Sequence, residues 1–103
     1  MKILLACVGG MSTSLIVSKM KKEADNQGID CEIEAIDFPA IGNVIDDYDV
    51  LLLGPQITYK FRSLKKEFGA KVPVEMIDAQ SYGLCDGKAI LAQAMQIYKE
   101  NQK

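Results

Sequence analysis

The chain has 103 residues, 49% of them apolar and 25% charged, which is the size and composition of one domain with a single modest core over residues 1–103. A formal net charge of −2 excludes a general attraction for nucleic acid, and no run reaches the roughly 18–20 apolar residues that direct membrane insertion needs. Histidine is absent, which excludes Cys-His and Ser-His catalysis, and three cysteines without a Cys-x-x-Cys pair predict a cytoplasmic protein with reduced thiols and no metal or cofactor.

The first third of the chain has the pattern of a strand, a helix and a second strand. The apolar run Lys2–Cys7 predicts the first strand. A helix is expected from Ser12 to about Gln27, ended by Gly28. The alternation of polar and apolar residues over Cys31–Ile36 predicts the second strand.

The remaining two thirds continue the alternation of apolar runs and helical patterns. Four apolar residues spaced four, three and four positions apart form one helical stripe, namely Ile57, Phe61, Leu64 and Phe68. The expected elements are a short helix within Pro39–Asp47, a strand over Val50–Leu53, a helix after Gly54-Pro55-Gln56 that Gly69 ends, a strand over Val72–Ile77, a loop over Asp78–Gly87 and a helix from Lys88 to about Lys99.

Repeated strand–helix units with nearly continuous apolar strands predict the α/β class. We expect an open four-stranded parallel sheet in the order 2-1-3-4 with helices on both faces, because right-handed crossovers favour that order. In such a sheet a ligand binds beyond the carboxyl ends of the strands, where the order reverses beside the first strand. Cys7 stands at that carboxyl end.

The segment that follows Cys7 is suited to hold a phosphoryl group beside a thiol. A helix start supplies unpaired backbone N–H groups and a positive dipole end, glycines let the backbone approach an anion closely, and hydroxyls add donors. Phosphoryl transfer needs a nucleophile and donors for the phosphoryl oxygens, and little other covalent chemistry from the protein. We therefore predict Cys7 as the nucleophile, and a phosphate loop made of Val8, Gly9, Gly10, Met11, Ser12, Thr13 and Ser14.

The string Cys-x-x-Gly-Met-Ser-Thr-Ser at residues 7–14 resembles the IIB component of the lactose/cellobiose family of the bacterial sugar phosphotransferase system. The run Leu52–Ile57, which contains Gly-Pro-Gln and is followed by Tyr59, supports the cellobiose-type branch. The resemblance implies that Cys7 accepts a phosphoryl group from a phosphohistidine on a IIA protein. It also implies transfer of that group to a sugar, such as cellobiose or a related β-glucoside, brought through the membrane by a IIC permease.

A low-molecular-weight cysteine phosphatase is the alternative interpretation. Such phosphatases place a similar loop after the first strand of a similar sheet, but their Cys-x5-Arg pattern requires arginine where this chain has Thr13. Asp78 follows the fourth predicted strand, near where those enzymes keep a general acid, and a turn-forming role is the other explanation for it. Hydrolysis of a phosphate monoester is therefore kept as the second hypothesis.

A secondary rim is predicted from Pro55, Gln56 and Tyr59 after the third strand, with Asp78 after the fourth. Gln56 or Tyr59 could contact the phosphate loop or a partner, or the segment could form a simple turn into a helix. A thiol oxidoreductase would need a resolving cysteine near Cys7. Cys31 and Cys85 are expected to be packing residues instead. A receiver domain is disfavoured, because the position for its phosphorylated aspartate holds a glycine, Gly54.

Overall fold

The computed structural model describes residues 1–7 and 11–101, and the side chains of residues 11 and 12 are not among the described parts. Four parallel strands form one sheet in the order β2-β1-β3-β4. The strands are β1 (Lys2–Cys7), β2 (Glu32–Asp37), β3 (Val50–Leu53) and β4 (Val74–Met76). The predicted α/β class and strand order are confirmed.

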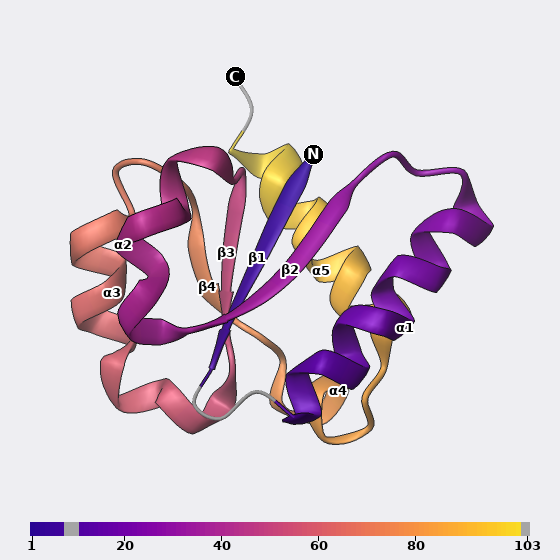
Figure 1. Cartoon of the computed structure of the whole chain (residues 1–103), viewed down its shortest axis with the longest axis horizontal. Helices are drawn as coiled ribbons and strands as arrows, with labels where there is room; N and C mark the ends of the chain where they lie inside the picture. Colours follow the sequence, from indigo (N-terminus) through magenta and orange to yellow (C-terminus); the bar gives the residue numbers. More distant parts are fainter. Residues whose placement is uncertain (8–10, 102–103) are drawn as a thin grey trace.

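Helices cover both faces of the sheet (Figure 1). One face carries α1 (Met11–Gln27) and α5 (Gly87–Glu100), and the other carries α2 (Ile41–Val44) and α3 (Phe61–Phe68). The shorter elements are the 3-10 segments η1 (Phe38–Ala40), η2 (Ile45–Asp47) and η3 (Pro55–Lys60), and the helix α4 (Ala79–Gly83). No helix in the described ranges is long and apolar enough to cross a membrane.

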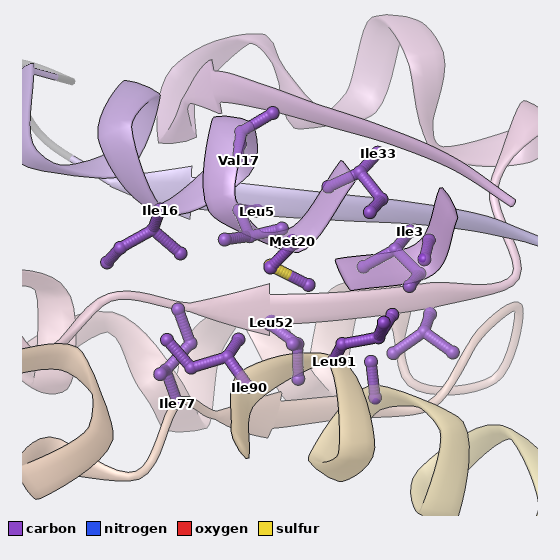
Figure 2. Close-up of a cluster of buried hydrophobic side chains, with 13 residues drawn as sticks. Ile3, Leu5, Ile16, Val17, Met20, Ile33, Leu52, Ile77, Ile90 and Leu91 are labelled. Carbon is purple, nitrogen blue, oxygen red and sulfur yellow. The ribbon is translucent and has the colours of Figure 1, made fainter. Parts of the chain in front are cut away.

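Alternation along the buried strands divides the core into two clusters. In β1, Ile3 and Leu5 point toward α1 and α5, whereas Leu4 and Ala6 point toward α2 and α3. Figure 2 shows the first cluster, in which Met20 of α1 and residues of α5 meet over the strands. Strands covered on both faces must be apolar throughout, which explains why β3 is four consecutive buried aliphatic residues.

The helix predicted after Gly54 is divided in two. Pro55 begins the 3-10 segment η3, and non-helical dihedral angles at Ile57 (φ −112°, ψ 28°) interrupt it before α3 starts at Phe61. The predicted apolar stripe is nevertheless correct, because Ile57, Leu64 and Phe68 are all buried in the second cluster. Periodicity thus identified the buried face without resolving the kink.

Two other boundaries differ from prediction. The fourth strand is shorter than Val72–Ile77, because the N–H of Val72 bonds back to Phe68 and the proline at position 73 has no N–H to donate. The segment Asp78–Gly87, predicted as a loop, contains the helix α4. The prediction was wrong there because five residues are too few to show a helical period.

Candidate functional site

Cys7 is the last residue of β1 and lies where the strand order reverses. It is a free cysteine with 1% of its surface exposed, its register partner on β2 is Asp37, and α1 begins at Met11. The structure therefore places Cys7 directly before a helix N-terminus at the carboxyl end of the sheet, as predicted. Of the predicted phosphate loop, Val8, Gly9 and Gly10 lie outside the described residues. The backbone of Met11 and Ser12 forms the first turn of α1.

The turn after β3 lies against one side of Cys7. The N–H of Gly54 donates to the carbonyl of Ala6 at 2.8 Å, which keeps this turn against the end of β1. A Cβ at Gly54 would lie 3.5 Å from the Cβ of Cys7 and only 2.6 Å from Oε1 of Gln56. The missing side chain at Gly54 therefore leaves room for the Gln56 carboxamide at the turn that lies against Cys7.

Tyr82 connects the turn after β3 to α1. Nε2 of Gln56 donates to Oη of Tyr82 at 2.7 Å, and Oγ1 of Thr13 lies 3.4 Å from the same oxygen. Thr13 is buried, with 1% of its surface exposed, so this hydroxyl is one polar contact available to it. Figure 1 shows α4, which carries Tyr82, beside the start of α1. Three elements that are distant in sequence thus meet at one phenol oxygen.

A hollow lies on the β2 side of Cys7. It has a volume of about 240 Å³ and is lined by Cys7, Ser14 of α1 and the end of β2 from Ala35 to Asp37. Asp37 pairs with Cys7 in register, and strand alternation directs both side chains to the face of the sheet that α1 covers. Cys7 therefore lies between the turn at Gly54 and the end of β2 that carries Asp37.

The remaining predicted rim residues do not gather at Cys7 in the same way. Asp78 caps α4, accepting from the N–H of Ser81 at 3.0 Å and from its hydroxyl at 2.9 Å. These two hydrogen bonds, the backbone one first, lower the pKa of Asp78. The turn-forming explanation for Asp78 therefore fits better than a general acid. Tyr59 is 71% exposed, and Pro55 serves to start η3.

Tyr82 was missed by the sequence interpretation. It lies in the segment predicted as a loop, and a tyrosine by itself carries no positional signal. Asp78 followed three residues later by Ser81 is compatible with an N-cap, and that pattern would have predicted the start of α4. Even so, its partners Gln56 and Thr13 could not have been named, because they lie 26 and 69 positions away.

The other two cysteines are packing residues, as predicted. Cys31 and Cys85 are both half-buried and lie against the cluster formed by α1, α5 and the sheet. Burial raises the pKa of the Cys31 thiol, which favours its neutral form.

Residues 2–93 match the protein family described as the PTS system, lactose/cellobiose-specific IIB subunit. The chain belongs to this family. Members are phosphotransferase components that act in sugar transport, so the predicted sugar phosphotransferase function is confirmed and the phosphatase alternative is not favoured. In this family the IIB component works with IIA and IIC components.

The most similar proteins agree with this assignment over nearly the whole chain. An oligo-beta-mannoside-specific EIIB component of Bacillus subtilis is 41% identical over 93% of this chain and 94% of its own length. A cellobiose-specific EIIB component of Lactococcus lactis is 46% identical over 89% of this chain and 91% of its own. The solution structure of a cellobiose-specific IIB component from Borrelia burgdorferi superposes with a TM-score of 0.84, at 35% identity, over 100% of this chain and 95% of that one.

Proposed function

We propose that Cys7 is the residue of this IIB component that carries the phosphoryl group. The observation that supports this most directly is its position at the carboxyl end of β1, between the strand-order reversal and the start of α1. A ligand of an open parallel sheet is expected there, and a helix N-terminus favours an anion. Neither Cys31 nor Cys85 has such a position.

The proposed step transfers a phosphoryl group from the phosphohistidine of a IIA protein to Cys7. The sulfur attacks phosphorus, the S–P bond forms and the P–N bond breaks, and the electron pair of that bond stays on the histidine nitrogen. The thiol loses its proton in this step, and the histidine nitrogen takes up one proton, so that the donor leaves as neutral imidazole. Positioning and charge stabilisation carry most of such a reaction, so few catalytic side chains are needed.

The phosphoryl oxygens would be held by the segment Val8–Ser14, with backbone N–H groups as the main donors. The N-terminus of a helix offers backbone N–H groups to an anion, and α1 begins four residues after Cys7. With Thr13 where cysteine phosphatases have arginine, the phosphoryl group would be stabilised by amides. A stable phosphocysteine fits a carrier better than an enzyme that hydrolyses its intermediate.

The second step would transfer the group from Cys7 to a sugar delivered by a IIC permease, with the protein acting on the cytoplasmic side. We propose cellobiose or a related β-glucoside as the sugar. The cellobiose-specific relatives support this choice, while the oligo-beta-mannoside-specific relative keeps a β-mannoside as the competing substrate. Phosphorylation of a β-glucoside and of a β-mannoside by permease-containing membranes together with this chain would decide between the two sugars.

The test of the phosphocysteine is the intact mass of the chain after incubation with a phosphorylated IIA protein. Wild type should gain one phosphoryl group, and Cys7→Ser should gain none while remaining folded. Cys31→Ser and Cys85→Ser are matched controls, since each removes one thiol and should be phosphorylated normally. Phosphorylation of Cys7→Ser, or its failure to fold, would contradict the assignment of Cys7.

A further inference from the structure

The hydrogen bonds around Tyr82 suggest a role that the phosphate loop alone does not explain. Tyr82 Oη receives the hydrogen bond from Gln56 and lies within 3.4 Å of the hydroxyl of Thr13. The Tyr82 ring is half-buried against the core cluster of α1 and α5. One hydroxyl thus joins η3 to the helix that follows Cys7.

The position of the Gln56 carboxamide depends on two features of its surroundings. The absence of a side chain at Gly54 makes room for Oε1, and the bond to Tyr82 holds Nε2 at the other end of the carboxamide. The backbone at Gly54 has φ −67° and ψ 151°, an extended conformation that any residue adopts. The glycine is therefore required for the space that the Gln56 carboxamide occupies and not for backbone conformation.

We propose that Tyr82 is a positioning residue for phosphoryl transfer at Cys7, acting by holding Gln56 and with it the turn that lies against Cys7, and by joining that turn to Thr13 on α1. This inference rests on the proposed role of Cys7. Transfer between two proteins requires the nucleophile and the helix that bears the phosphate loop to keep one relative geometry, and a misplacement of about 1 Å can cost two orders of magnitude in rate. The Tyr82 hydroxyl contributes to that geometry from outside the loop.

The experiment uses Tyr82→Phe, which removes the hydroxyl and keeps the ring in the core. Tyr98→Phe is the matched control, because Tyr98 is also half-buried against the same cluster but lies on α5 among residues that line a different groove. The rate of phosphocysteine formation from phosphorylated IIA is measured over a range of donor concentrations. We expect kcat about tenfold lower for Tyr82→Phe with KM for the donor unchanged, and wild-type values for Tyr98→Phe.

A double-mutant cycle tests whether Tyr82 acts through Gln56. Gln56→Ala should lower kcat to a similar extent, and the double variant Gln56→Ala with Tyr82→Phe should be no slower than either single variant. The 31P resonance of the phosphocysteine should shift in Tyr82→Phe and stay in place in Tyr98→Phe. A purely structural role would lower the urea midpoint and leave the rate per folded molecule and the 31P resonance unchanged.

Two failures are distinguishable. If wild type gains no phosphoryl group, the role of Cys7 is wrong and the positioning role falls with it. If wild type and Tyr82→Phe are phosphorylated at the same rate, or if the two single defects multiply in the double variant, only the role of Tyr82 is overturned.

Discussion

Two regions of the molecule each depend on a close approach at a glycine. Gly87 lies where α5 crosses α1, and Gly54 lies in the turn beside Cys7, but the atoms that surround the two glycines differ. A Cβ at Gly87 would lie 2.6 Å from Cβ of Lys19 and 2.7–2.8 Å from backbone atoms of Lys19 and Met20. A Cβ at Gly54 would meet the far end of the Gln56 side chain at 2.6 Å and Cys7 at an ordinary 3.5 Å. Backbone atoms of a packed helix cannot move aside as easily as the end of a flexible side chain.

Because of this difference, we expect Gly87 to matter for the stability of the fold and Gly54 to matter for the geometry of the site. At Gly87 the spacing of two helices over the core depends on the absent methyl group, so stability should respond to a substitution. At Gly54 a methyl group would only displace a carboxamide, so the rate of phosphoryl transfer should respond and stability should change little. The following predictions are ordered from the largest expected effect to the smallest.

Gly87→Ala should lower the free energy of unfolding by about 1–3 kcal/mol, the cost of overpacking a well-packed contact. The measurement is urea unfolding followed by circular dichroism. Gly83→Ala is the control, because a Cβ there meets nothing within 4 Å, and it should stay within about 0.5 kcal/mol of wild type. Equal stabilities of the two variants would show that the α1–α5 crossing adjusts freely.

Gly54→Ala should fold with nearly wild-type stability, losing at most the roughly 0.5–1.5 kcal/mol of one hydrogen bond. Its phosphocysteine should nevertheless form about tenfold more slowly, because the displaced Gln56 carboxamide can no longer reach Tyr82. Rapid-quench measurement with phosphorylated IIA, beside urea unfolding, tests both parts. A normal rate would mean that the space at Gly54 serves only the turn.

Asp37→Asn should raise the equilibrium fraction of phosphocysteine by about threefold, since it removes a negative charge in register with Cys7. Intact-mass analysis at equilibrium with the IIA donor gives this fraction. Asp25→Asn makes the same charge change on the exposed far half of α1 and should have no effect. The effect of Asp37→Asn should shrink with added salt. An unchanged fraction of phosphocysteine at low salt would show that the Asp37 carboxylate does not act on the phosphoryl group.

Asp78→Asn tests the cap of the helix that carries Tyr82. Because hydrogen bonds from Ser81 lower the pKa of Asp78 in the folded chain, its stabilising contribution is present above the unfolded pKa and is lost as the pH falls through the folded value. Wild type should therefore melt slightly above Asp78→Asn near neutral pH, and the difference should shrink below about pH 4. A difference that persists at low pH would exclude the carboxylate as its cause.

Strand and helix placement could be predicted because the signals are local. The apolar run of β1, Gly28 at φ +68° after α1, and the apolar spacing of Phe61, Leu64 and Phe68 in α3 are each signals within a few residues, and each was correct. The predictions failed at Ile57 and at α4, where segments of a few residues carry no period. Short elements take their conformation from packing, which a local pattern does not contain.

The sequence by itself determined the α/β class, the sheet order and the position of Cys7 at the carboxyl end of β1, because apolar periodicity and right-handed crossovers leave few alternatives. Only the tertiary structure decided that Gln56, Thr13 and Tyr82 meet at one hydroxyl and that Asp37 faces the same side as Cys7. The physical reason is that such contacts join residues far apart in the chain. Their geometry follows from how complete helices pack on the sheet, and no nearby residue encodes it.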